Sequence, residues 1–400
     1  MTKNIIFCAD GTWNYPGQDE NNDGLPDQTN VYKLFLALKG HFDNGTLMDA
    51  GEQEKTYFDE KNQIKQVAKY IHGVGDSKNP ISKLIFGATG AGTLTRIIRG
   101  YTYISRMYEA GDHIYIVGFS RGAYTARALA AMIASQGVLK GISYRSKEAR
   151  ENAYKKAAQV WYRHRSKQST LTEYLAKLTS TISFLPGFIS KNDIDDSDLI
   201  PVDIQAVGVW DTVGALGIPE FIGDGAKYDA FRFADQSLNK KIKRGFHAVA
   251  LDERRTPFIP TLWDKADHVE QVLFPGAHAD VGGGYPEHEL SDIALGWMKE
   301  KLEQVGVLFD ALNISPNPAG IAHKPWKSPI FFLQQEAREF NSDSVVEHPS
   351  IQARMAAGPV CPEPDDQAKP YQPRNRPSGF MLDHSEERQQ QTKAMEALTE

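Results

Sequence analysis

Apolar runs of strand length alternate with helix-like stretches from the N-terminus to about residue 306, and this alternation limits the possible folds more than any other feature. Strands are predicted at residues 5–9, 66–72, 114–117, 204–210 and 269–274, and helices at residues 30–38, 94–109, 123–134, 240–251 and 291–305. This order favours an α/β fold with a mainly parallel sheet and helices on both of its faces.

Residues 141–200 interrupt the alternation with a charged, helix-rich segment, which we interpret as a helical cap inserted into the fold. The core is then divided into a first part at residues 1–140 and a second part at residues 201–310. Residues 311–400 are rich in proline and weakly periodic, which predicts a loop-rich C-terminal wrap. Within the cap, apolar side chains at helical spacing in residues 171–189 fit either a helix packed on the core or a lipid-facing lid that makes peripheral membrane contact.

Charge and composition argue against several classes of protein. The 400 residues carry a formal net charge of -6, whereas a general nucleic-acid binder needs a basic face. The two cysteines, Cys8 and Cys361, cannot form a disulfide framework and fit a reducing compartment. The apolar run at the N-terminus is too short for a secretory signal, so we expect a protein made in the cytoplasm, with export by a route without a cleavable signal left open.

Residues 113–129 read as strand, tight turn and helix, and the turn carries the sequence Gly-Phe-Ser-Arg-Gly at positions 118–122. In this context a G-x-S-x-G pattern predicts a nucleophile elbow, in which a strained turn presents the serine at the end of a strand. The flanking glycines are needed because a Cβ at either position would collide with the strand or the helix. We therefore predict that Ser120 is a nucleophile, the alternative being a structural turn.

A nucleophilic serine needs a general base and a carboxylate that orients the base, and the chain order that accompanies this elbow is Ser, Asp, His. Asp211 follows the strand predicted at residues 204–210 and is the predicted acid, the alternative being an aspartate that caps its own turn. His278 follows the strand predicted at residues 269–274 and is the predicted base. Three histidines are rivals for that role, namely His247 on a predicted helix and His348 and His384 in the C-terminal region.

Acyl transfer passes through a tetrahedral oxyanion, which two N–H donors must stabilise. One predicted donor is the backbone of Arg121, which directly follows Ser120 at the start of a helix. The other is expected in the loop after the first strand, from Gly11 or Thr12. Asp10 in the same loop either takes a direct catalytic part or forms a turn that is held by the Thr12 hydroxyl.

No cofactor or metal ion is required by these patterns. Residues 87–93 are glycine-rich, but they lack the lysine of a P-loop and the spacing of a dinucleotide fingerprint. Asp10, His278 and Asp280 are ligand types that metals use, yet they show no paired ligand spacing. We therefore assign Asp10 and Asp280 to shaping the site.

Several segments together resemble one known family, and they lie in order at residues 10–14, 118–123, 209–213, 247–255, 278–285 and 348–350. The family is the α/β-hydrolase domain of formerly unknown function that includes the phospholipase effectors of type VI secretion systems, the Tle1-type lipases. The resemblance extends from residue 4 to about residue 380. It implies an α/β-hydrolase fold and an esterase that acts on phospholipid acyl chains, with Ser120, Asp211 and His278 at the family's triad positions.

The sequence thus predicts a serine esterase or lipase that forms an acyl-enzyme at Ser120 and needs no cofactor. Two alternatives stay open. The first is an esterase for small or polymeric esters away from membranes, which differs in its rates on micelles and on monomeric esters. The second is a non-catalytic interaction module on the same fold, which a fluorophosphonate probe would leave unlabelled.

Overall fold

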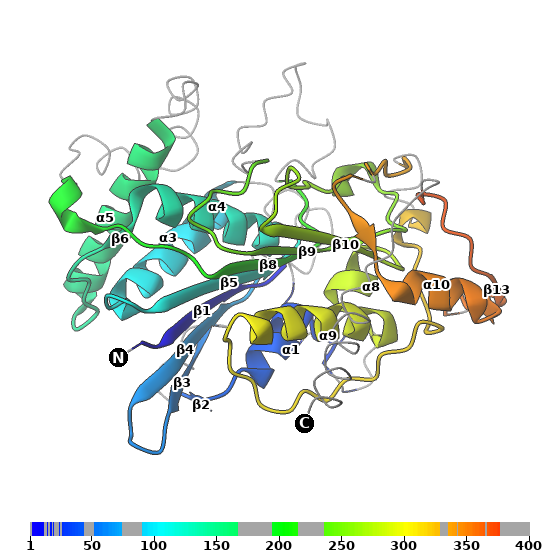
Figure 1. The fold of residues 1–400 in the computed structure, drawn as a ribbon, viewed down its shortest axis with the longest axis horizontal. Helices are drawn as coiled ribbons and strands as arrows, with labels where there is room; N and C mark the ends of the chain where they lie inside the picture. The colour runs from blue at the N-terminus through cyan, green and yellow to red at the C-terminus, as the bar shows by residue number, and fades with distance from the viewer. Residues whose placement is uncertain are drawn as a thin grey trace, which may run out of the picture.

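The computed structural model describes residues 2–11, 14, 17, 19, 24, 26–43, 52–73, 90–166, 194–214, 236–328, 335–341, 343–364 and 366–376. Within these ranges the centre of the molecule is a nine-stranded sheet with the order β11-β10-β9-β8-β5-β1-β4-β3-β2 (Figure 1). Its strands are β1 (Asn4–Ala9), β2 (His41–Phe42), β3 (Glu52–Phe58), β4 (Ile64–Ile71), β5 (His113–Phe119), β8 (Ala206–Trp210), β9 (Gly245–Ala250), β10 (Val269–Phe274) and β11 (Val346–Glu347).

The pairing of these strands is mainly parallel. Every neighbouring pair from β11 to β4 is parallel, whereas β3 and β2 add antiparallel strands at one edge. Parallel strands place their carboxyl ends at one edge of a sheet, and ligand sites of open α/β sheets lie there. The loops after β1, β5, β8 and β10 therefore converge on the same side of the molecule.

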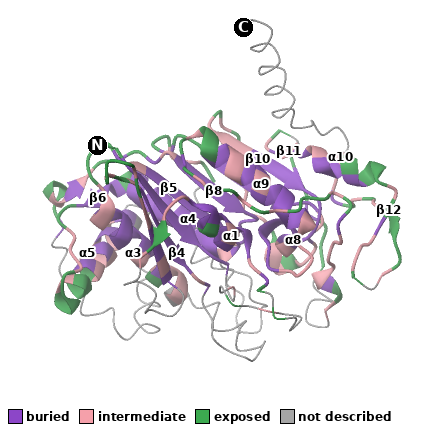
Figure 2. Cartoon of the chain, turned by 90° about the horizontal axis from the view of Figure 1, so that it is seen from below, coloured by how far each residue is buried: buried purple, intermediate pink, exposed green. Residues whose placement is uncertain are grey.

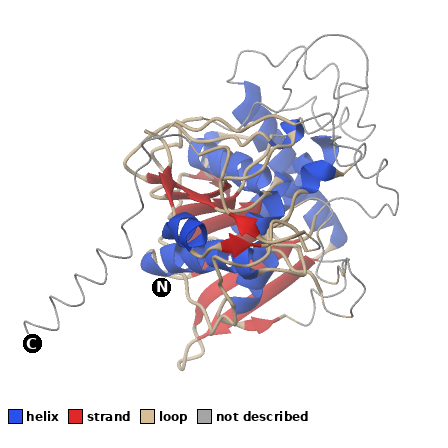
Figure 3. Cartoon of the chain, turned by 90° about the vertical axis from the view of Figure 1, so that its right-hand side faces the viewer, coloured by secondary structure: helices blue, strands red, loops and turns tan. Residues whose placement is uncertain are grey.

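Helices cover both faces of the sheet, as Figure 3 shows from the side. One face carries α3 (Gly90–Met107), α4 (Arg121–Gln136) and α5 (Lys147–Ser166), and the other carries α1 (Asn30–Ala37), α8 (His278–Gly282) and α9 (Glu289–Gln304). The central strands are buried on both sides (Figure 2). This arrangement confirms the predicted α/β-hydrolase-like fold.

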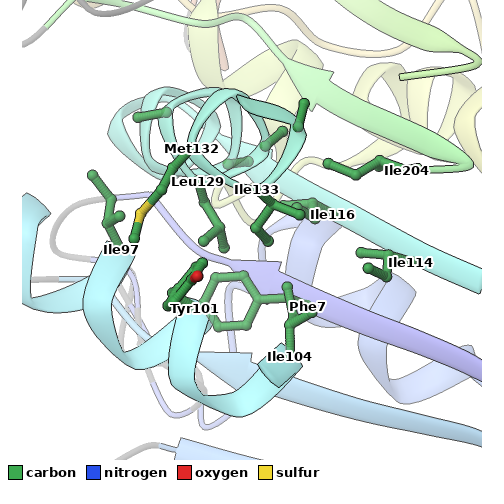
Figure 4. Close-up of a cluster of buried hydrophobic side chains, with 14 of the residues drawn as sticks. Phe7, Ile97, Tyr101, Ile104, Ile114, Ile116, Leu129, Met132, Ile133 and Ile204 are labelled. Atoms are coloured by element: carbon green, nitrogen blue, oxygen red, sulfur yellow. The ribbon is translucent and has the colours of Figure 1, made fainter. Parts of the chain in front are cut away.

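Strand β1 contributes side chains to the hydrophobic clusters on both faces of the sheet. Alternate side chains of a strand point to opposite faces, so Phe7 joins the cluster beneath α3 and α4 while Cys8 joins the cluster beneath α1 and α9. In Figure 4 the Phe7 ring lies among Tyr101 of α3 and Leu129 of α4. Because both faces are buried, the strand reads as a continuous apolar run, the pattern from which it was predicted.

The prediction of a helix at residues 240–251 is wrong, because residues 245–250 form strand β9 within the parallel part of the sheet. All residues of β9 are buried. A strand that is covered on both faces has no alternation of polar and apolar residues, so periodicity alone cannot distinguish it from a buried helix. The consequence is that His247 is a sheet residue rather than a helical one.

The predicted cap segment is described only in part. Its helix α5 packs against α3 and α4 through Ala157, Val160 and Trp161. The short antiparallel strands β6 (Val138–Leu139) and β7 (Leu199–Ile200) close the base of the segment. Residues 171–189, with the predicted lid or core helix, lie outside the described residues. Among the helices that are described, none combines the length and the apolar composition that crossing a membrane requires.

The described part of the C-terminal region, which extends to residue 376, packs against the core. Strand β11 pairs with β10 at the edge of the sheet. The remaining C-terminal elements and the short 3₁₀ turns of the chain are η1 (Asp196–Asp198), η2 (Thr256–Phe258), η3 (Pro325–Lys327), α10 (Pro349–Ala356), β12 (Pro359–Val360) and β13 (Lys369–Pro370). Residues 335–341 have no regular structure but pack Phe340 into a small cluster with Val249 and Leu251.

Candidate active site

Ser120 lies on the tight turn between β5 and α4, with a strained backbone at φ 56° and ψ -123°. The glycines on either side have no room for a side chain. A Cβ at Gly118 would lie 2.3 Å from the carbonyl oxygen of Gly122, and one at Gly122 would lie 2.1 Å from the carbonyl oxygen of Ala9. The steric reason for the G-x-S-x-G pattern is therefore as the sequence predicted.

Asp211 and His278, which are 67 residues apart, are brought together by the ends of two parallel strands. Asp211 directly follows β8, and His278 begins α8 shortly after β10. The Nδ1 atom of His278 lies 2.6 Å from Oδ2 of Asp211, and both side chains are buried. Oδ1 of Asp211 accepts from the backbone N–H of Ala250 in β9, so this carboxylate bridges neighbouring strands and does not cap its own turn.

Two aromatic rings hold the imidazole of His278 next to the elbow. The ring of Phe119, the residue before Ser120, lies 4.6 Å from the His278 ring, and that of Phe258 in η2 lies 4.9 Å away (ring centroids). Within the described part of the chain, no hydrogen bond joins the Ser120 hydroxyl to the His278 ring. Catalytic hydrogen bonds are often long or poorly aligned before substrate binds, so the absence of this bond is compatible with a catalytic pair.

Arg338 is a residue of this site that sequence reasoning missed. Its guanidinium group forms a fork on Asp211, with Nη1 2.7 Å from Oδ1 and Nη2 2.9 Å from Oδ2. Burial by itself would raise the pKa of Asp211, but the charge of Arg338 and the hydrogen bonds from His278 and Arg338 hold that pKa well below its usual range. The carboxylate therefore stays ionised in the protein interior.

Burial lowers the pKa of His278 below its ordinary value of 6.5, although the hydrogen bond and charge of Asp211 act in the opposite direction. The ring is consequently neutral at neutral pH. Because Asp211 occupies Nδ1, the other ring nitrogen, Nε2, is left to accept a proton.

The backbone around His278 is fixed by a buried acid. Glu253 accepts from the N–H of His278 at 3.1 Å and is also bound by the Arg255 side chain at 2.8 and 2.9 Å. Burial favours the neutral acid, but the Arg255 charge outweighs it and lowers the pKa of Glu253 to about 2. Arg255 in turn stacks on the Phe258 ring, with 3.6 Å between its guanidinium carbon and the ring centroid. Residues 253–258 thus contact both the backbone and the ring of His278.

The start of the loop after β1 lies close to Ser120, the predicted nucleophile. A Cβ on Gly11 would lie 3.5 Å from the Cβ of Ser120. The N–H of Gly11 donates to Oδ1 of Asp10 at 2.7 Å, and Thr12 lies outside the described residues. Arg121 is the first residue of α4, a position whose backbone N–H has no acceptor within its helix.

Asp10 is held by hydroxyl groups that the sequence did not identify. Its carboxylate accepts from the hydroxyl of Thr29, at 2.9 Å to each oxygen, and from the hydroxyl of Tyr70 at 2.6 Å. Burial raises the pKa of Asp10, while these hydrogen bonds and the charge of Arg96 oppose the rise. In the described structure Asp10 therefore orders the loop that faces Ser120.

Asp280 lies two residues after His278 in α8 and has its own polar partners. It accepts from the N–H of Ala277 at 2.8 Å, and its Oδ1 lies 2.6 Å from Nδ1 of His323. Burial lowers the pKa of His323, but the hydrogen bonds and charges of Asp280 and Glu287 raise it above the ordinary value. Asp10 and Asp280 are thus occupied by different partners. Among the described residues, no group of three or more His, Cys, Asp or Glu side chains is arranged to hold a metal ion.

The rival histidines have other surroundings. His247 is fully buried in β9, where its Nε2 accepts from the N–H of Thr212 at 3.1 Å, and burial lowers its pKa to about 3. His348 precedes α10 and accepts from the N–H of Ser350 at 3.2 Å. His384 lies outside the described residues. Of the three candidate histidines that the structure describes, His247, His278 and His348, it is His278 that is hydrogen-bonded to Asp211.

Comparison with known proteins identifies a family. The model for the catalytic domain of Tle1-like phospholipase effectors of the type VI secretion system (T6SS) matches residues 3–301. An uncharacterized protein of Saccharomyces cerevisiae is 28% identical over 267 residues, which make up 64% of this chain and 32% of that protein. The chain therefore spans about a third of the length of this relative.

Three solved structures to which the chain was matched share little sequence with it. An uncharacterized protein from Pseudomonas aeruginosa is 16% identical (TM-score 0.41), and the match covers 78% of this chain and 47% of that one. The Tle1 effector bound to the VgrG spike is 18% identical (TM-score 0.38; 72% and 52% covered), and an esterase of Thermogutta terrifontis is 10% identical (TM-score 0.30; 67% and 95% covered). Because the family model covers most of the sequence, the chain belongs to the family of Tle1-like catalytic domains.

Proposed function

We propose that the chain is a serine esterase that hydrolyses the acyl esters of phospholipids, with Ser120 as nucleophile, His278 as general base and Asp211 as the acid that orients it. The strongest support is geometric. The pair formed by Asp211 and His278, 2.6 Å apart, lies against the residue that precedes an elbow serine. Three separate strand ends contribute these side chains. We infer the phospholipid substrate from the family, whose description names phospholipase effectors.

In the proposed reaction Oγ of Ser120 attacks the ester carbonyl carbon while Nε2 of His278 accepts the hydroxyl proton. The backbone N–H groups of Arg121 and of Gly11 or Thr12 stabilise the oxyanion that forms. Because the N–H of Gly11 is engaged by Asp10, Thr12 is the stronger candidate for the second donor. Protonated His278 then gives its proton to the leaving alcohol, and water hydrolyses the acyl-enzyme by the same route.

The activity should depend on pH through one acidic limb. A base acts only when it is unprotonated, and the pKa of His278 lies below 6.5 because the ring is buried. We therefore expect kcat/KM to be constant near neutral pH and to fall as the pH drops through a midpoint below 6.5. Initial rates on a soluble short-chain ester measure this profile. A midpoint above about 7 would show that a group with a different environment is the base.

The substrate class is tested by comparing phospholipid vesicles with a soluble ester of the same acyl chain. We expect faster hydrolysis of the vesicle lipid, with a free fatty acid and a lysophospholipid as the products seen by mass spectrometry. Ser120→Ala protein is the control for both substrates. Equal or faster turnover of the monomeric ester would favour the alternative of an esterase for small or polymeric esters.

A further inference from the structure

The Arg338 side chain is buried and forms an ion pair with Asp211. It is 6% exposed, and its Nη1 and Nη2 atoms contact both carboxylate oxygens at 2.7 and 2.9 Å. The same two nitrogens donate to the carbonyl oxygens of Ala250, at 2.6 Å, and Phe258, at 2.5 Å. A two-point contact between arginine and carboxylate fixes the plane of the carboxylate as well as its position.

The segment that carries Arg338 is joined to residues 253–258, which contact His278. Gln335 forms a β-bridge with Arg255, and the N–H of Glu336 donates to the carbonyl oxygen of Arg254 at 2.8 Å. Phe340 is buried in the cluster that contains Val249 and Leu251. The segment itself lies beyond residue 301, where the family match ends, whereas its partners at residues 249–255 lie within the match. The C-terminal region therefore reaches the acid of the proposed triad.

We propose that Arg338 is a positioning residue for the proposed reaction: it fixes the orientation of the Asp211 carboxylate towards His278 and offsets part of its negative charge. The inference rests on the proposed function, in which His278 is the base. An uncompensated Asp211 would stabilise the protonated imidazole and keep it charged up to a higher pH. The guanidinium group thus extends the range in which His278 is a free base towards acidic pH.

Other charges also act on this pair, so the effect of Arg338 must be separated from theirs. Within the part of the chain that the structure describes, the titratable and charged groups that act on Asp211 or His278 are His247 in β9, Glu253 and Arg255 before η2, and Arg338 itself. His247 is neutral because burial lowers its pKa to about 3. Glu253 and Arg255 neutralise one another. Arg338 is therefore the cation whose removal changes the net charge at Asp211 most directly.

Two substitutions separate the charge of Arg338 from its geometry. Arg338→Gln keeps a hydrogen-bond donor without the charge, and we expect the midpoint of the acidic limb of kcat/KM to rise by roughly one pH unit. Arg338→Lys keeps the charge but loses the planar fork. We expect its midpoint to stay near the wild-type value while kcat on the plateau falls about tenfold, because the carboxylate is less well oriented.

A buried arginine in the same C-terminal region supplies a matched control. Arg354 is 1% exposed and donates to the carbonyl oxygens of Pro318 and Gly320, at 2.7 and 2.6 Å. Arg354→Gln should lower the melting temperature but leave the midpoint and the rate per folded molecule unchanged. All variants are compared after thermal melts and circular dichroism have given the folded fraction.

The outcomes distinguish this inference from the proposed function. Wild-type midpoints and plateau rates in folded Arg338 variants, with Ser120→Ala inactive, would overturn the positioning role alone. If Ser120→Ala remained active, the proposed function itself would be wrong. Should Arg338→Gln fail to fold, the plateau rate of Arg338→Lys decides, since a purely structural arginine predicts no loss of kcat per folded molecule.

Discussion

Substitution of Ser120 by alanine is expected to abolish ester hydrolysis while leaving the fold intact. The hydroxyl oxygen is the atom that would form the acyl-enzyme, and losing a triad member typically costs about 10⁴ to 10⁶ in rate. Alanine adopts the backbone of the elbow as readily as serine does, so the strain at φ 56° is unchanged. Rates on a soluble ester and labelling by a fluorophosphonate probe measure the effect, with a thermal melt to verify folding.

A second serine on α4 gives a matched control. Ser135 lies 2.7 Å from Nδ1 of His164, so it also has a histidine neighbour, but it is at the far end of the helix from the elbow. Ser135→Ala should keep both hydrolysis and labelling. Retention of more than about a tenth of the activity in folded Ser120→Ala protein would refute the nucleophile assignment. Absence of labelling in the wild type would favour the non-catalytic interaction module.

The main features of the fold and site were predictable where chemistry is encoded in a short stretch of sequence. The elbow needs Gly118 and Gly122 for steric reasons that act within a few residues. Asp211 and His278 were predicted because each follows a strand, and the ends of parallel strands converge. The misassigned strand β9 illustrates the opposite situation, since a short apolar run that is buried on both faces carries no periodic signal.

Arg338 could not be predicted from local sequence. It is 127 residues from Asp211 in the chain and lies in a segment without regular structure, between Glu336 and Glu339, where an arginine is ordinarily solvated. Its role depends on a long-range contact that only the folded chain shows. The same holds for Asp10, whose hydroxyl partners, Thr29 and Tyr70, come from other elements of the fold.

Replacing His278 by alanine should lower the rate as much as replacing Ser120. The two residues act in one step, because the serine attacks only if a base accepts its proton. The double variant should consequently be little slower than either single variant, since residues that act as a unit are not additive. Measurement of kcat/KM for the three proteins on one soluble ester gives this comparison. A double variant slower by the product of the two single effects would show that the residues act independently.

His348→Ala is the control that separates a general base from a structural histidine. The ring of His348 stacks on Phe274, with centroids 4.6 Å apart, and its Nδ1 accepts from the N–H of Ser350 at the start of α10. Loss of such a helix cap typically costs about 1 kcal/mol of stability, so we expect a lower melting temperature and a near-normal rate per folded molecule. The reverse result, an inactive His348→Ala protein and a nearly normal His278→Ala protein, would show that His348 and not His278 is the general base. The pairing of His278 with buried, ionised Asp211 is the physical reason to expect otherwise, because that carboxylate stabilises the imidazolium formed during attack.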